Sequence, residues 1–181
     1  PLQTTNPYYA KFGWTSKADV PLPDEDTVWQ STDTTLSPNR PVTLTWDNGV
    51  GLRFIRTVDV DAAYMFTVSD RVENYGSEAI SLTPFGAIVR KGEPETVNFF
   101  ILHEGALGVF DEVLDQQDYD DIIDADNGRI EEVPETAGGW IGITDKYWLT
   151  ALIPDQQTKA SFSYNHWQDD NRDNFQVDFH N

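Results

Sequence analysis

Three histidines are the first side chains that could do acid–base or metal chemistry in this chain. They are His103, His166 and His180. None belongs to an HExxH motif, and no two are four residues apart, so the sequence gives no support for a zinc site built on histidine. For His103, which follows an aromatic segment, we expect a structural role. A catalytic base and a ligand contact are the two other interpretations.

The remaining catalytic motifs also lack support. The sequence has no GxSxG elbow and no GxxxxGK[ST] loop. Residues 105–108 (GALG) are too short for a dinucleotide fingerprint and no helical pattern follows them. Gly138-Gly139 is more typical of a bulge or a close approach of two backbones. The chain has no Cys, which excludes thiol catalysis, disulfides and Cys-ligated zinc. We therefore predict no catalytic, cofactor-binding or metal-binding residues, and no enzyme.

The acidic stretch at residues 115–126 is the best candidate for a calcium site. If Gly128 takes the sixth position of an EF-hand loop, the first, third and twelfth positions fall on Ile123, Ala125 and Pro134. None of these side chains is a calcium ligand. A solvated loop is therefore expected, and a looser calcium site stays open.

Aromatic residues in the last third of the chain suggest a binding role instead. Trp140, Tyr147 and Trp148 could form a stacking platform for sugars or peptides, although packing in the core is the expected role. If they line a groove, an extended peptide or an acyl chain would suit it.

Composition limits the partners. The net charge of −19, from 31 acidic and 12 basic residues, argues against nucleic acid and against anionic lipid headgroups. Such acidity either solvates the surface or recruits a basic partner.

The 181 residues suffice for one domain with a core. No apolar run reaches about 18 residues, the length of a membrane span. Because the chain starts at Pro1 without a signal peptide, we expect a piece of a longer protein that lacks its transmembrane helices.

Alternation of apolar and polar residues predicts strands along most of the chain. Val42, Leu44 and Trp46 alternate with threonines, and Asp47-Asn48-Gly49 after them is a hairpin turn signal. The predicted strands are residues 42–46, 52–58, 63–72, 80–89 with an interruption at Pro84, 97–102, 138–143, 147–153, 162–167 and 175–179.

Two stretches lack this pattern. The prolines in residues 1–40 predict a long connection with short edge strands. Residues 111–126 are expected to form a long surface loop with at most one short helical turn. Since no segment shows an amphipathic helix of about 12 residues, the sequence favours an all-β sandwich or barrel with long loops and little helix.

One block is more specific than any composition argument. Residues 100–105 (FILHEG), followed by 138–154 (GGWIGITDKYWLTALIP), resemble the periplasmic domain of the YidC membrane protein insertase family in its alphaproteobacterial form. Residues 7–14 (PYYAKFGW), 46–49 (WDNG), 56–58 (RTV) and 64–68 (YMFTV) fit the same family, so the resemblance runs from about residue 7 to 160.

The resemblance implies a fold and a role. The fold would be a β-supersandwich of two stacked, mainly antiparallel sheets, similar to galactose mutarotase-like folds. Residues 1–181 would be a single periplasmic domain without its terminal strands. It would act as an accessory domain at the periplasmic face of the bacterial inner membrane, meeting Sec translocon accessory subunits and nascent membrane proteins. No residue here would carry the insertion mechanism, which the family places in its membrane-embedded core.

Two other classes of function stay open. A mutarotase-like, sugar-processing enzyme would need a histidine and carboxylates that converge in one cleft. A carbohydrate-binding module would need a coplanar row of exposed aromatic residues, for which Trp140, Trp148 and Trp167 are the candidates.

Overall fold

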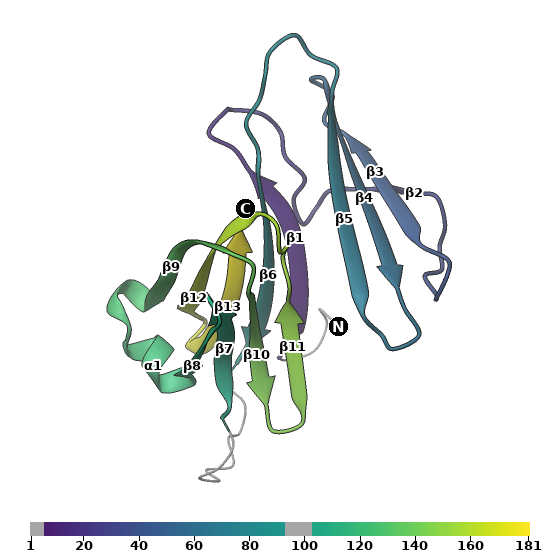
Figure 1. Ribbon diagram of the computed structural model, residues 1–181. Helices are drawn as coiled ribbons and strands as arrows, with labels where there is room; N and C mark the ends of the chain where they lie inside the picture. The colour runs from purple at the N-terminus through teal and green to yellow at the C-terminus, as the bar shows by residue number, and fades with distance from the viewer. Residues whose placement is uncertain (1–5, 93–102) are drawn as a thin grey trace. The chain divides into compact units, whose positions relative to one another are not determined.

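The computed structural model describes residues 6–92 and 103–181, and the strand predicted at 97–102 lies outside them. The fold is built almost entirely from antiparallel β-sheets, which confirms the predicted all-β class (Figure 1). Two compact units are present. The first combines the residues up to Gly13 with Thr83–Asn181, and the second is Trp14–Leu82. Each unit is described by itself, and the single sandwich domain stays a prediction.

Two sheets build the first unit. The five-stranded sheet has the order β1-β6-β13-β12-β9, with bounds β1 (Tyr8–Thr15), β6 (Thr83–Lys91), β9 (Arg129–Ala137), β12 (Lys159–Asp169) and β13 (Arg172–His180). The four-stranded sheet has the order β11-β10-β7-β8, with bounds β7 (Gly105–Phe110), β8 (Val113–Asp118), β10 (Trp140–Asp145) and β11 (Trp148–Leu152).

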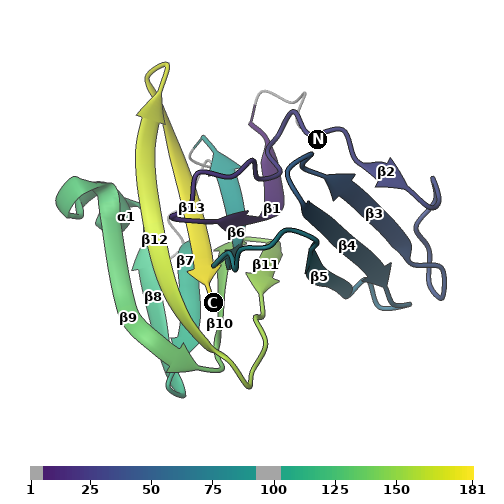
Figure 2. The same ribbon diagram turned by 90° about the horizontal axis from the view of Figure 1, so that it is seen from above.

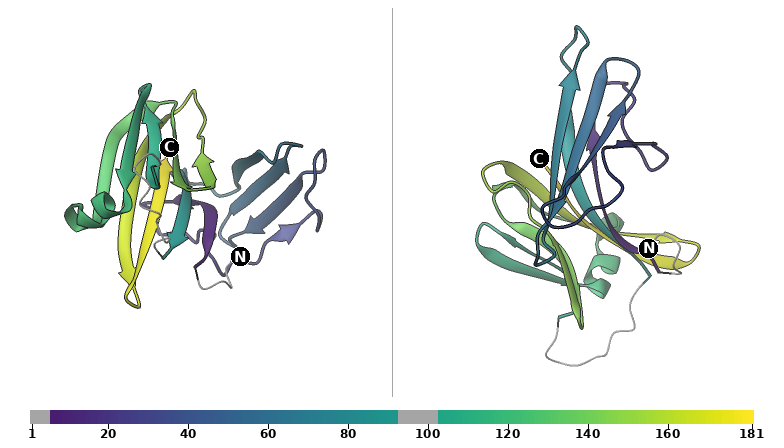
Figure 3. Two further views of the ribbon diagram at one scale, coloured as in Figure 1. Left: turned by 90° about the horizontal axis from the view of Figure 1, so that it is seen from below. Right: turned by 90° about the vertical axis from the view of Figure 1, so that its right-hand side faces the viewer.

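Alternation explains why the β12–β13 hairpin forms. Phe162 lies opposite Phe179 and Tyr164 opposite Val177, and these residues face the core. Asp170 and Asn171 join the strands with φ values of 50° and 58°, the left-handed backbone that a two-residue hairpin turn with matching twist requires. Figure 3 shows this element as a long yellow hairpin.

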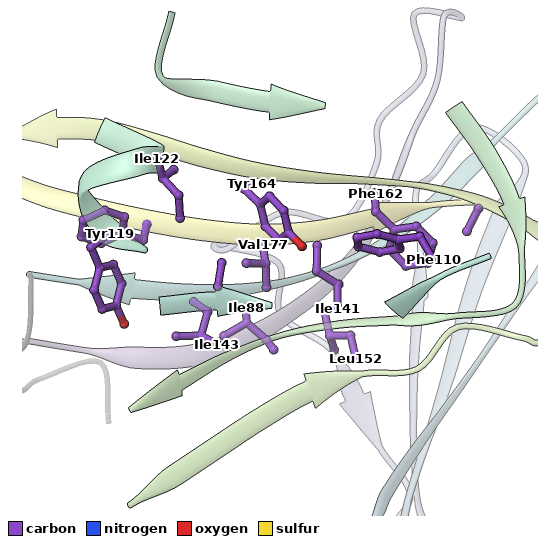
Figure 4. Close-up of a cluster of buried hydrophobic side chains, with 13 residues drawn as sticks. Ile88, Phe110, Tyr119, Ile122, Ile141, Ile143, Leu152, Phe162, Tyr164 and Val177 are labelled. Carbon is purple, nitrogen blue, oxygen red and sulfur yellow. The ribbon is translucent and has the colours of Figure 1, made fainter. Parts of the chain in front are cut away.

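The core of the first unit lies between its two sheets. Rings from both sheets meet there: Phe110 packs on Phe162 with centroids 4.7 Å apart. Ile141 and Ile143 of the four-stranded sheet are fully buried against the same cluster (Figure 4). Burial of each such large side chain contributes about 1.5–3 kcal/mol, so this cluster is the main source of stability.

The acidic stretch does not form the long surface loop that the sequence predicts. It contains strand β8, the short helix α1 (Tyr119–Asp124) and a 3-10 turn at Asp126–Gly128. Tyr119 and Ile122 are 3% and 1% exposed, and Tyr119 packs on Phe175 with centroids 4.5 Å apart. Burial of two apolar side chains fixes this stretch against β12, and Figure 2 shows α1 at that edge of the sandwich.

The second unit is a smaller sheet with its own core. Its strands follow the order β2-β3-β4-β5, with bounds β2 (Gln30–Ser31), β3 (Val42–Asp47), β4 (Leu52–Val60) and β5 (Phe66–Asn74). Trp14 packs on the buried Phe54 with centroids 4.9 Å apart. The predicted turn after β3 is confirmed, since Asn48 Oδ1 accepts hydrogen bonds from the backbone of Val50 and Leu52.

Candidate interaction surface

The three histidines lie apart, and each pairs with a different carboxylate. His103 Nδ1 lies 2.9 Å from Asp118 Oδ1, and its Nε2 lies 2.9 Å from the carbonyl oxygen of Ala106. His166 Nε2 lies 2.8 Å from Asp173. Both nitrogens of His103 therefore hold protein groups in place, which fits the structural interpretation.

Metal and sugar chemistry gain no support from the described part of the chain. Among the side chains that the structure describes, which leave out residues 131–134 as well as 1–5 and 93–102, no group of three or more His, Cys, Asp or Glu could hold a metal ion. No histidine there is paired with two carboxylates, the arrangement that a mutarotase-like site would need.

A buried carboxylate orders the polar face of β12 and β13. Asp178 is 3% exposed and accepts hydrogen bonds from Ser163 at 2.8 Å, Asn165 at 2.6 Å and Gln176 at 2.8 Å. Burial raises the pKa of Asp178, but the hydrogen bonds from His180, Gln176 and Ser163 outweigh burial and hold the pKa below its ordinary value. This group is structural, because neighbouring side chains of the same sheet already occupy its oxygens.

The lowered pKa of Asp178 predicts how the chain responds to acid. Its contribution to the free energy of unfolding is present above the ordinary pKa of 3.8 and is lost as the pH falls through its lower folded-state pKa. Urea unfolding of Asp178→Asn should show a lower stability at pH 7. It should also show a smaller further loss below pH 3.8 than the unsubstituted chain. Parallel stability curves for the two chains in acid would contradict this assignment.

A partly buried ion pair links the two sheets of the first unit. Arg90 Nη1 of β6 lies 2.7 Å from Asp145 Oδ2 of β10, and the side chains are 18% and 15% exposed. The Tyr119 hydroxyl donates to Asp145 Oδ1 at 2.9 Å, and the Arg90 guanidinium lies 5.3 Å from the centre of the Tyr8 ring. Burial, followed by the charge of Asp145, raises the pKa of Tyr119 and keeps its hydroxyl protonated as a donor.

The four-stranded sheet presents an apolar surface on its side away from the core. Ile141, Ile143 and Leu152 face the core, so the residues that alternate with them face outward. We name this outward surface the apolar face. Its residues are Leu107, Val109, Leu114, Trp140, Leu149, Ala151 and Ile153.

Strand register aligns these residues across the sheet. Leu114 of β8 lies opposite Val109 of β7, and Val109 lies opposite Trp140 of β10. Leu114, Leu149 and Ile153 are 55%, 57% and 57% exposed, so more than half of the surface of each is open to solvent. The row is continuous over three strands, and Ile153 follows the fourth strand directly.

The next row is uncharged too. Gln116, Leu107, Gly142 and Ala151 lie in register across β8, β7, β10 and β11. Gly142 keeps this row flat, and an added Cβ would come within 2.5 Å of the Thr150 carbonyl oxygen. The first two rows of the apolar face are therefore uncharged, on a chain with a net charge of −19. The third row runs in register from Leu149 through Thr144 and Gly105 to Asp118, which is its one charged residue.

The aromatic residues singled out in the sequence do not form a platform. Trp148 lies opposite Asp145, on the face of the sheet that bears Ile143, whereas Trp140 belongs to the opposite face. Tyr147 and Trp148 are 78% and 74% exposed, so the expected core packing is wrong for both. Trp167 belongs to the other sheet, so Trp140, Trp148 and Trp167 are not coplanar.

Comparison with known proteins decides the family. The model of the YidC periplasmic domain matches residues 2–181 of this chain. The chain belongs to the YidC periplasmic domain family. The resemblance seen in residues 138–154 is thereby confirmed over almost the whole chain.

Curated relatives carry the same name. The "Membrane protein insertase YidC" of Methylobacterium nodulans is 46% identical over 170 residues, which cover 91% of this chain and 28% of the relative. That of Granulibacter bethesdensis is 43% identical over 180 residues, covering 98% and 31%. That of Jannaschia sp. is 44% identical over 164 residues, covering 85% and 26%. The chain thus spans less than a third of the length of these relatives.

Membership in the YidC periplasmic domain family sets the location of the chain but not its partners. The family consists of periplasmic domains of insertases rather than enzymes, which fits a domain at the periplasmic side of a membrane. None of the described helices is long and apolar enough to cross a bilayer.

Proposed function

We propose that this chain is an accessory domain of a membrane protein insertase and supports insertion and folding of inner-membrane proteins without catalysis of its own. The parent protein would be a multi-pass protein of the bacterial inner membrane, with this domain on the periplasmic face. The observation that carries the proposal is the uncovered apolar face in a chain of this family.

The uncharged, apolar side chains of the apolar face favour an apolar segment as its partner. Its first two rows hold no charged residue and few hydrogen-bonding side chains. Such a surface gains free energy mainly by removing apolar area from water, at about 25 cal/mol per Å². An apolar segment of a membrane protein that has not yet entered the bilayer has the matching chemistry. The net charge of −19 keeps a domain with this exposed surface in solution.

Sec translocon accessory subunits are the second partner class that family resemblance suggests. A folded subunit would need a complementary patch of roughly 800 Å² on each partner. Under our proposal the apolar face serves nascent segments, and a Sec accessory subunit would contact another part of the domain.

The proposal predicts the effect of placing charge on the apolar face. Leu149→Asp with Ile153→Asp should weaken binding of a transmembrane-segment peptide, kept soluble by a neutral polyethylene glycol tail, by at least about tenfold. Both side chains are 57% exposed, so the fold should survive. Fluorescence anisotropy of the labelled peptide with the purified chain measures the affinity.

A matched control uses exposed valines outside the apolar face. Val28 and Val50 are 86% and 62% exposed, and Val28→Asp with Val50→Asp adds the same charge. This control should bind the peptide as the unsubstituted chain does. Equal affinities for both double variants would remove the apolar face as the binding surface.

A further inference from the structure

The turn between β4 and β5 carries an exposed apolar tip in the second unit. Its residues are Ala62, Ala63, Tyr64, Met65 and Phe66, and we name them the hairpin tip. Tyr64, Met65 and Phe66 are 82%, 56% and 57% exposed. The tip lies at one end of the three long strands (Figure 1), and its five residues carry no charge.

The hairpin tip is held in one conformation. The Asp61 N–H donates to the Met65 carbonyl at 3.0 Å, and the Tyr64 N–H donates to the Asp61 carbonyl at 3.2 Å. Asp61 Oδ1 also accepts from the backbone of Ala63 at 2.8 Å and of Met65 at 2.9 Å. The conformation is therefore fixed before any partner arrives, and little ordering entropy remains to be lost on binding.

Tyr64 stands in an unfavourable backbone conformation for its type. Its φ of 63° lies in the left-handed region, which glycine and asparagine adopt at lower conformational energy than a bulky residue does. A strained residue that is 82% exposed gains nothing from packing inside the fold. A strain of this kind points to a use of the side chain outside the fold.

We infer that the hairpin tip inserts into the headgroup region of a lipid bilayer and anchors the second unit to the membrane surface. Tyrosine suits that depth, because its ring enters the apolar boundary while its hydroxyl stays with water and headgroups. Met65 and Phe66 add unbranched and aromatic apolar surface beside it.

Size and shape favour lipid over a protein partner. A stable protein interface needs roughly 800 Å² on each side with good complementarity, more than a protruding tip with three large side chains supplies. Insertion into a bilayer needs no complementary surface. Relatives of this chain are named membrane protein insertases. With a net charge of −19, the contact must be apolar, so zwitterionic lipid is preferred over anionic lipid.

The absence of cysteine allows a specific probe. In Ala63→Cys, an environment-sensitive NBD label marks the tip alone, and Val50→Cys marks an exposed turn elsewhere in the unit. With phosphatidylcholine vesicles, we expect a blue shift and a severalfold rise in emission at position 63 and none at position 50. Anionic phosphatidylglycerol should reduce the response. Equal responses at the two positions, or a stronger one with anionic vesicles, would overturn the inference.

Substitution and crosslinking complete the test. In the labelled chain, Tyr64→Asn with Met65→Gln should lower vesicle binding severalfold with an unchanged circular dichroism spectrum, and unchanged binding would overturn the inference. In the membrane-bound parent protein carrying Ala63→Cys, a benzophenone on the introduced thiol should form adducts with lipid. Adducts with a protein subunit alone would contradict the inference.

Leu149→Asp with Ile153→Asp should leave vesicle binding unchanged, which separates this test from that of the proposed function.

Discussion

Phe162→Ala should lower the free energy of unfolding by about 3–5 kcal/mol. Phe162 is 1% exposed between the two sheets of the first unit and packs on Phe110 at 4.7 Å. Its removal loses the transfer free energy of the ring and leaves a cavity, which neighbouring strands of both sheets cannot fill without breaking their register. Urea unfolding followed by circular dichroism measures the change.

Leu149→Ala is the matched control for this substitution. Leu149 lies in the same unit but is 57% exposed on the apolar face. Its truncation should change the free energy of unfolding by no more than about 0.5 kcal/mol. If both substitutions destabilise the chain equally, the two-sheet core described for the first unit is wrong.

Asp145→Ala should destabilise the chain by about 2–4 kcal/mol, because it leaves the partly buried Arg90 without its counter-charge. Arg90 is 18% exposed, and its Nε is buried without a hydrogen-bond partner among the described residues. Tyr119 also loses the acceptor at 2.9 Å. Asp145→Asn keeps an oxygen for Tyr119, so it should lose less.

Glu135→Ala tests whether this effect depends on burial. The Glu135–Lys159 pair belongs to the same unit, but its side chains are 72% and 67% exposed and 3.9 Å apart. Removal of this pair should cost less than about 1 kcal/mol. Thermal unfolding of the variants side by side gives the comparison, and equal losses for Asp145→Ala and Glu135→Ala would contradict the structural role of the Arg90–Asp145 pair.

Strands with strong alternation could be predicted from the sequence. The pattern of Val42, Leu44 and Trp46 locates β3, and Phe162 to Trp167 locates the middle of β12. The predicted strand at 80–89 begins too early, since β6 starts at Thr83 and includes Pro84. The first two cases succeed because one face of each strand meets the core, so local pattern and tertiary burial agree.

Strands β8 and β9 could not be predicted in the same way. β8 begins after a turn at Asp111 and Glu112, whose φ values are 48° and 66°. An Asp-Glu pair does not predict a turn with two positive φ values, so the sequence gives no signal for it. β9 is acidic and contains Pro134, and it is a strand because it pairs with β12 along a register with shifts. Pairing with the distant strand β12 outweighs weak local propensity in β9, whereas β8 forms a hairpin with β7, the strand directly before it.

The apolar face could not be found from the aromatic residues alone. A usable signal is present in residues 106–110 and 149–153, where apolar residues occupy successive rather than alternating positions. Such runs indicate strands with two apolar faces. Only the register shows that the second face is continuous across β8, β7 and β10, since the pairing of β7 with β10 joins residues far apart in the sequence.

Photocrosslinking in membranes tests the central claim most directly. A photoreactive amino acid at Ile153 of the apolar face, in the parent insertase, should label a nascent membrane protein during its insertion. The same group at Val50, a similarly exposed turn of the second unit, should not. Labelling of the nascent chain from Val50 but not from Ile153, or from neither position, would contradict the account.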